Sequence, residues 1–277
     1  MGDAFEEGRN PVKTAIFSVL AAAVLLLCMA GAGGDISLQS PGSPVIRIID
    51  GDTVEMVIEG NPVRVRYLLV DSPELHHPGR PVEELGEEAR RLNGRLLGKG
   101  TIRLEFDEEH HDRYGRLLAY VWAGSGDGES FVNEEMVRQG LAVPLVIPPN
   151  GRYAPKVYDA FRKAKEDGAG LWGRAEKRFF TSAQLWSEAP YLAGSFVTLC
   201  MRIEKKEKQG KRLLFREGRT ALAFYRDGET ESLLDLEPGH RILAVGKVLL
   251  SRNGCEMPIA SPSQIRRLPD QDFFLNY

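Results

Sequence analysis

Two short acidic stretches in the first half of the chain hold residue types that can bind a cation. They are residues 50–52, Asp-Gly-Asp, and residues 71–74, Asp-Ser-Pro-Glu. An Asp-Gly pair between two alternating apolar runs is a strong hairpin signal, so a turn explains Asp50 but leaves Asp52 unexplained. Because Asp52 and Asp71 both lie at strand ends beside turns, we expect their carboxylates to meet at one rim of a small barrel.

The two acidic stretches predict a calcium site with a base beside it. Asp52, Asp71 and a main-chain carbonyl form a set of hard oxygen ligands, which suits calcium better than zinc. Ser72 supplies the carbonyl, because Pro73 biases Ser72 toward extended geometry and so fixes where its carbonyl points. Glu74 follows closely enough to take a proton from a water beside the cation, and we expect it to be the general base.

Two arginines complete the candidate site. Arg66 precedes Asp71 on a strand, and Arg116 follows the turn Asp112 to Gly115. Their planar guanidinium groups suit phosphate oxygens and the charge that develops on them during reaction. Taken singly, Arg66 has an ordinary explanation as a surface strand residue and Arg116 as part of a turn. Cation, base and two guanidiniums together predict phosphodiester hydrolysis.

Alternating apolar patterns predict the strands and helices that position these residues. Residues Val82, Leu85, Ala89, Leu92 and Leu96 share one helical face behind Pro81, a good first-turn residue. Strands are expected at Val45–Ile49, Thr53–Ile58, Val63–Val70, Thr101–Phe106 and Leu117–Ala123, with further helices at Phe131–Gln139 and Pro155–Glu166. The pattern indicates an α+β, mostly β, fold in which a small β-barrel carries helices.

A second β-rich pattern begins beyond Gly170–Gly173. Five short strands between residues 195 and 260, the last two joined at Asn253-Gly254, predict an OB-fold-like β-barrel. This second region has no acidic constellation, so we expect it not to be required for chemistry. "EKKEKQGKR", Glu204 to Arg212, is expected to be a solvated hairpin tip, with a weaker alternative in which its lysines follow a phosphate backbone.

Composition limits the class of protein. The chain has 277 residues, 43% hydrophobic and 27% charged, with a formal charge of -3, which argues against non-specific coating of nucleic acid. Cys200 and Cys255 fall on strand patterns that do not favour a bridge, and we expect two buried free thiols. The pairs His76-His77 and His110-His111 are expected to be exposed and are assigned no metal site.

The N-terminus reads as an export segment. Thr14 to Gly31 carries no charge and follows Arg9 and Lys13. The pattern Ala30-Gly31-Ala32 favours cleavage by a signal peptidase, whereas the length of the apolar run and the nearby acids leave an uncleaved membrane anchor open. The first 34 residues are therefore expected to be a signal peptide or a membrane anchor.

Several motifs, in order and at matching spacing, closely resemble the staphylococcal nuclease (thermonuclease) family. They run from about Val45 to Trp172 and read "IDGDTV", "RVRYLLVDSPE", "HHPGRPVEELGEEA", "DRYGRLLAYVW", "VNEEMVRQGLA" and "GLW". The resemblance implies an OB-like five-stranded barrel with three helices and a calcium-dependent nuclease that acts on DNA and RNA and leaves 3'-phosphorylated products. It assigns the metal to Asp52, Asp71 and Ser72, the base to Glu74, and phosphate to Arg66 and Arg116.

Two positions depart from the family pattern. Position 72 is Ser where the prototype has Thr, a mild change if only the carbonyl binds metal. Val143 to Tyr153, "VPLVIPPNGRY", lacks the tyrosines that the prototype places near the bound nucleotide. The resemblance therefore leaves base stacking and nucleotide preference open.

The sequence predicts an exported, monomeric, calcium-dependent endonuclease with DNA or RNA as substrate. It is expected to be secreted, periplasmic or membrane-anchored with its nuclease domain outside the cytoplasm. The expected divisions are a linker at 35–44, a nuclease-like domain at 45–175 and an OB-fold-like domain at 190–270. Two alternatives are a catalytically weak scaffold of the envelope that binds nucleic acid or protein, and a protein whose C-terminal barrel is the main module.

Overall fold

Strands dominate the structure, which is α+β in class. The computed structural model describes residues 37–40, 45–76, 82–98, 101–124, 126–225, 230–252 and 254–269. The predicted signal peptide or anchor, Pro81, His77 and Asn253 lie outside these ranges. Within the ranges, no helix combines the length and apolar character needed to cross a membrane.

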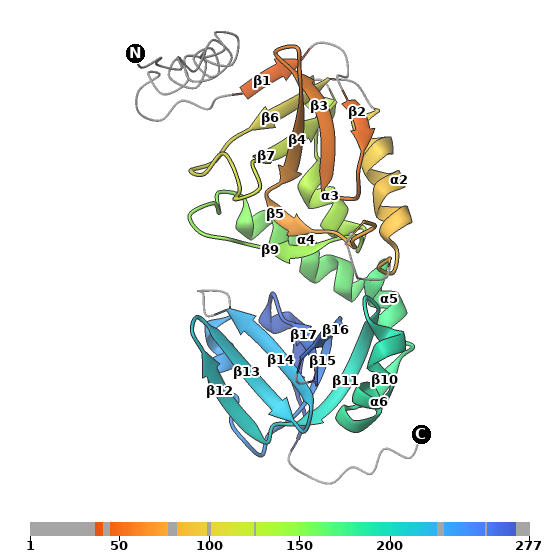
Figure 1. The fold of residues 1–277 in the computed structure, drawn as a ribbon, viewed down its shortest axis with the longest axis vertical. Helices are drawn as coiled ribbons and strands as arrows, with labels where there is room; N and C mark the ends of the chain where they lie inside the picture. The colour runs from red at the N-terminus through yellow and green to blue at the C-terminus, as the bar shows by residue number, and fades with distance from the viewer. Residues whose placement is uncertain are drawn as a thin grey trace, which may run out of the picture. The chain divides into compact units, whose positions relative to one another are not determined.

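The first half of the chain builds one mixed sheet. Its strand order is β1-β6-β7-β4-β3-β2, with β8 beside β7 (Figure 1). The bounds are β1 Ser37–Ser40, β2 Val45–Ile48, β3 Thr53–Ile58, β4 Asn61–Tyr67, β6 Ile102–Glu105, β7 Leu117–Ala123 and β8 Ser130–Phe131. All pairs are antiparallel except β4 with β7. β1 pairs with β6, so part of the segment expected to be a linker belongs to the sheet.

The expected strand Val63–Val70 divides in two. Strand β4 ends at Tyr67, and β5, Leu69–Asp71, pairs instead with β9, Val143–Leu145. Leu69 has a φ of 66°, a left-handed conformation that a leucine adopts only where surrounding contacts hold it. This change of direction sets Asp71 in a separate two-stranded sheet.

Helices α2 Gly86–Leu97, α3 Val132–Arg138, α4 Ala154–Glu166 and α5 Leu171–Ala175 accompany this sheet. Ala89, Leu92 and Leu96 of α2 are buried, as their spacing predicts. The expected start of this helix behind Pro81 is wrong, because Leu85 takes a left-handed φ of 62° and α2 begins only at Gly86. Val82 is consequently exposed and not part of the helical face.

The second half of the chain forms two further sheets. Their orders are β10-β11-β15-β18 and β12-β13-β14-β17-β16. The bounds are β10 Phe179–Thr181, α6 Ser182–Leu192, β11 Phe196–Arg202, β12 Lys205–Gln209, β13 Arg212–Glu217, β14 Thr220–Tyr225, β15 Arg241–Lys247, β16 Leu249–Ser251, β17 Gly254–Pro258 and β18 Ile265–Arg267. Among the described residues, the strand pairing does not close into a barrel. The expected hairpin is present, since residues 204–212 hold strand β12 and the turn at residues 210–211 that joins it to the antiparallel β13.

One hydrophobic core joins these two sheets and α6. Leu185, Leu199, Phe215 and Met257 belong to it and are fully buried. Cys200 and Cys255 are both free thiols, as expected, but only Cys255 is buried. Cys200 is half-buried, because β11 turns Leu199 and Met201 toward the core and the intervening residue away from it.

Candidate active site

The Asp-Gly-Asp stretch forms the turn that the sequence predicts. The main-chain nitrogens of Ile49 and Asp50 donate to the carbonyl of Thr53 at 3.0 and 3.3 Å. Asp50 Oδ1 accepts from the nitrogen of Asp52 at 3.0 Å. Both acids are almost completely buried, with exposed fractions of 6% for Asp50 and 4% for Asp52. These two carboxylates are therefore shielded from solvent, unlike those of an ordinary exposed turn.

The two acidic stretches lie in direct contact. The main-chain nitrogen of Ser72 donates to Asp52 Oδ2 at 2.5 Å. Gly51 allows this approach, because a Cβ atom at position 51 would lie 2.7 Å from Ser72 Cβ and 2.8 Å from Ala89 Cβ. Because Gly51 has no side chain, the turn can pack closely against Ser72 and α2.

Arg66 joins the two predicted metal ligands. Its Nη1 lies 3.2 Å from Asp52 Oδ2 and its Nη2 lies 3.1 Å from Asp71 Oδ1. Nη1 also donates to the carbonyls of Tyr67 and Val70, at 2.9 and 2.7 Å. Burial lowers the pKa of Arg66, but the charges of Asp52 and Asp71 outweigh it and raise that pKa above its usual value. Arg66 therefore stays charged and fixes the bend between β4 and β5.

A buried asparagine supports the turn from α2. Asn93 Nδ2 donates to the carbonyl of Asp50 at 3.0 Å, and its Oδ1 accepts from the Tyr67 hydroxyl at 2.8 Å. Asn93 is fully buried. Its side chain therefore links α2, β4 and the acidic turn through two satisfied hydrogen bonds.

Glu74 lies beside the acid cluster and is half-buried. Its main-chain nitrogen donates to Glu83 Oε2 at 3.0 Å, and its own Oε1 accepts from the nitrogen of His76 at 3.2 Å. The charge of Glu74 is among the influences that raise the pKa values of Asp50 and Arg66, so it acts on the cluster electrostatically. A partly accessible carboxylate at this place is suited to accept a proton.

Arg116 makes a different set of contacts from Arg66. Its Nε donates to Asp112 Oδ2 at 2.7 Å, and its main-chain nitrogen donates to Asp112 Oδ1 at 2.9 Å. Arg116 directly precedes β7, in which Leu118 pairs with Arg66. The structure thus brings Asp52, Arg66, Asp71, Ser72 and Glu74 together, whereas Arg116 forms its ion pair with Asp112, within its own turn.

The donor set at this cluster fits a hard cation. Burial and the charge of Asp52 raise the pKa of Asp50 to about 8, as expected where carboxylates crowd together. The Ser72 hydroxyl is buried without a hydrogen-bond partner. In the described part of the chain, no three His, Cys, Asp or Glu side chains form a metal-binding group. The fit therefore rests on two carboxylates, Asp52 and Asp71, with a main-chain oxygen.

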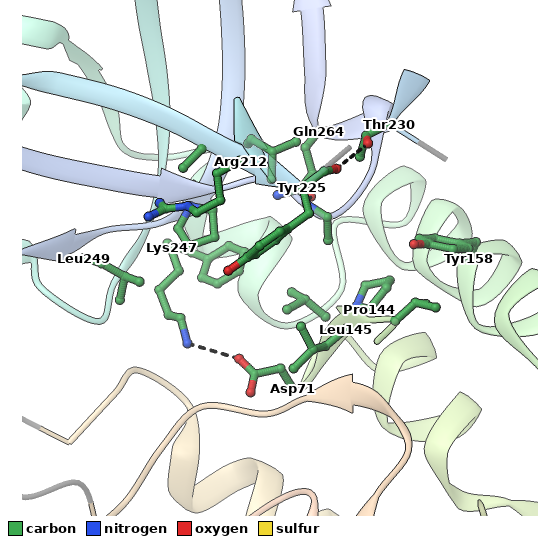
Figure 2. Close-up of a pocket in the computed structure, with 17 residues that line it drawn as sticks. Asp71, Pro144, Leu145, Tyr158, Arg212, Tyr225, Thr230, Lys247, Leu249 and Gln264 are labelled. Carbon is green, nitrogen blue, oxygen red and sulfur yellow. Dashed lines mark hydrogen bonds and ion pairs between the residues drawn. The ribbon is translucent and has the colours of Figure 1, made fainter. Parts of the chain in front are cut away.

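Asp71 also borders a cavity of about 380 Å³. Figure 2 shows Lys247 extending toward Asp71 on one side of it and Leu145 and Pro144 lying beside the acid. Lys247 Nζ lies 3.5 Å from Asp71 Oδ2, the oxygen that does not contact Arg66. A residue of the second β-rich half thus reaches a predicted metal ligand.

Sequence reasoning missed four residues that shape this site. Asn93 carried a signal, since it is a polar residue next to Leu92 on the apolar side of a predicted helix. Gly51 was explained by the hairpin alone. Glu83 and Lys247 carried no local signal, because they are 164 positions apart in the chain and each has an ordinary surface pattern.

Comparisons with known proteins find matches to the first half of the chain. The family described as Staphylococcal nuclease homologue matches residues 64–174. Thermonuclease of Staphylococcus hyicus is 38% identical over 128 residues, which are 46% of this chain and 73% of that protein. Thermonuclease of Staphylococcus intermedius is 33% identical over 163 residues, which are 56% of this chain and 95% of that protein.

A further relative is longer than the matched region. Endonuclease YncB of Bacillus subtilis is 41% identical over 131 residues. The match covers 47% of this chain and 60% of that protein, so the chain spans less than two thirds of this relative.

Proposed function

Because the chain belongs to the staphylococcal nuclease family, we propose that it is a calcium-dependent endonuclease that hydrolyses phosphodiester bonds of DNA, RNA or both. The observation that carries the proposal is the position of Arg66 between Asp52 and Asp71, with Glu74 beside them. Products that carry a 3'-phosphate are part of the same proposal.

The residues divide the work of hydrolysis. Asp52, Asp71 and the carbonyl of Ser72 would hold Ca²⁺. When bound, the cation supplies positive charge at the phosphate and lowers the pKa of a neighbouring water. Glu74 accepts the proton from the attacking water. Arg66 and Arg116 donate hydrogen bonds to phosphoryl oxygens as negative charge grows on them.

The mostly buried guanidinium of Arg66 has a second task in this proposal. It keeps the carboxylates of Asp52 and Asp71 apart by a fixed amount, since each lies within 3.2 Å of one of its nitrogens. Without that bridge, two like charges would lie close together, one of them on the buried Asp52, which costs free energy. Arg66 therefore organises the ligand set as well as the phosphate.

The finer divisions of the chain belong to the same proposal. Residues 45–175 form an OB-like nuclease domain that carries helices α2 to α5, one more than the three expected, and residues 190–270 form an OB-fold-like domain that helps to hold the substrate. The protein is exported as a monomer, through a leader at residues 1–34 that is cleaved or kept as an anchor. N-terminal sequencing of protein from the native host distinguishes a start near Gly33 from an intact Met1.

Cleavage assays test the proposed activity. The protein is incubated with single- and double-stranded DNA and RNA, first with Ca²⁺ and then with a chelator. Internal cuts that require Ca²⁺ and leave 3'-phosphate ends are expected. Binding of these nucleic acids without any cleavage would instead favour the scaffold of the envelope, and cleavage that persists in chelator would remove calcium from the mechanism.

A further inference from the structure

Two neighbouring acids before α2 are held by residues from the second half of the chain. Glu84 Oε2 lies 2.7 Å from Arg178 Nη1 and accepts from the main-chain nitrogen of Phe196 at 3.3 Å. Glu83 Oε2 accepts from Lys247 Nζ at 2.9 Å. The segment that leads from the acid cluster into α2 is thus fixed by residues that lie far away in sequence.

Two of these contacts, those of Phe196 and Lys247, come from one pair of strands. Phe196 of β11 stands directly opposite Lys247 of β15 in their antiparallel register. Phe196 and Lys247 are therefore neighbours across the ladder. They contact Glu84 and Glu83, which are neighbours in the chain. Gly194, just before β11, adds to the fit, since a Cβ atom there would lie 3.1 Å from Glu83 Cγ. The register of β11 and β15 sets where Lys247 reaches.

Lys247 acts on two members of the proposed active site by different routes. It contacts Asp71 directly, with Nζ 3.5 Å from Oδ2 (Figure 2). It reaches Glu74 through Glu83, because Glu83 Oε2 accepts both from Lys247 Nζ at 2.9 Å and from the Glu74 nitrogen at 3.0 Å. The Lys247 ammonium group therefore contacts a predicted metal ligand directly. It contacts the main chain of the predicted base only through Glu83.

Burial makes this contact important. Glu83 is 5% exposed, and the Lys247 side chain is 16% exposed. A buried carboxylate without a positive partner is costly and takes up a proton or moves toward water. Lys247 is the positive partner that holds Glu83 Oε2 where it accepts from the Glu74 nitrogen.

We propose that Lys247 is a positioning residue for hydrolysis at the acid cluster, holding Glu83 in place so that Glu83 fixes the main chain of Glu74. The proposal rests on the nuclease function proposed above. It assigns the second β-rich half a part in turnover, which the sequence did not lead us to expect. Substrate and cation ligands remain those of the first half.

Lys247→Met removes the charge and keeps the aliphatic stem. Lys206→Met is the matched control, because Lys206 also pairs with an acid, Glu237, and has a side chain that is 23% exposed. In Lys247→Met we expect kcat to fall about ten- to hundred-fold, with KM within about threefold of the parent value. Calcium affinity, measured by calorimetry, should be equal or higher, because a positive charge beside Asp71 is gone. Lys206→Met should match the parent protein in all three quantities.

A second measurement does not depend on activity. Amide hydrogen exchange by NMR should be faster at Glu74 in Lys247→Met and unchanged in Lys206→Met, while Lys247→Arg should stay close to the parent protein. Parental exchange at Glu74 and parental kcat in Lys247→Met would each overturn the proposal, as would calcium affinity that falls in step with kcat. If Lys247→Met does not fold, Lys247→Gln is judged by the same outcomes. An inactive parent protein would refute the nuclease function, while exchange at Glu74 would still test the positioning.

Discussion

The main-chain nitrogen of Ser72 donates a hydrogen bond of 2.5 Å to Oδ2 of Asp52. This bond joins the two acidic stretches, and the residues that it links are 20 positions apart in the chain. The two stretches lie at the ends of different strands. It directs one carboxylate oxygen of Asp52 at the loop that carries Ser72 and Glu74. The ligand set is therefore built by the contact between two turns, and whatever disturbs their approach should disturb the site.

Gly51→Ala should separate these two turns. The added methyl group would overlap Ser72 Cβ at 2.7 Å and Ala89 Cβ at 2.8 Å, so the turn must shift. Overpacking of this kind costs about 1–3 kcal/mol of unfolding free energy. Gly128→Ala is the control, because a Cβ there meets no atom within 4 Å. Denaturant unfolding measures both variants, and equal stability of the two would show that the close approach at Gly51 is not needed.

Asn93→Ala should weaken both the fold and the acidic turn. The change leaves the Asp50 carbonyl and the Tyr67 hydroxyl without their buried partner, which costs about 1–3 kcal/mol. Asn133→Ala serves for comparison, since Asn133 is equally buried and bonds Val121 and Leu68 instead.

Both asparagine variants should lose stability in urea by similar amounts, but only Asn93→Ala should also weaken calcium binding. Equal calcium affinity in the two variants at a temperature where both are folded would remove Asn93 from the support of the site.

Asp107 should contribute stability that depends on pH. Its Oδ2 accepts from the Tyr120 hydroxyl at 2.5 Å and from the Gly151 nitrogen at 2.8 Å. Burial raises the pKa of Asp107, but these hydrogen bonds outweigh it and lower that pKa below its usual value. A lowered pKa means that the stability is present at neutral pH and is lost as pH falls below the unfolded value, about 3.9, through the folded value.

Thermal unfolding of the parent protein and Asp107→Asn across pH tests this sign. The difference in Tm should be largest near neutral pH and shrink in acid. A difference that grows as pH falls would contradict the direction given for Asp107.

The sequence predicted elements whose signal is local. Strand β7 has the predicted bounds, and α3 and α4 match within a residue, because alternation and helical spacing are read over a few neighbouring positions. The start of α2 and the break before β5 were missed. Both depend on left-handed leucines, Leu85 and Leu69, that only tertiary contacts hold in place.

The same distinction applies to the candidate site. The strand and turn pattern predicted Asp52 and Asp71 at strand ends, and Arg66 lies between them. The bridge itself could not be predicted, because it depends on the bend at Leu69. The contact of Lys247 with Glu83 depends on the register of two strands late in the chain, and no local pattern encodes that.

Asp71→Ala should abolish calcium binding at the cluster, because the cation loses one of two close carboxylate ligands. Asp159→Ala is a suitable control, since this acid is 71% exposed on α4. Titration calorimetry with Ca²⁺, with circular dichroism as a check on folding, gives the comparison. Calcium affinity that survives in Asp71→Ala would place the cation elsewhere.

The role of Glu74 as general base is the central claim, and single-turnover cleavage by Glu74→Gln at saturating Ca²⁺ tests it most directly. The substitution keeps the shape of the side chain. It also keeps the hydrogen bond from the main-chain nitrogen of residue 74 to Glu83. Calcium should still bind, and the rate should fall about a hundred-fold or more, as expected when a base is removed. A variant that binds calcium and cleaves at the parent rate would show that Glu74 takes no proton in the reaction.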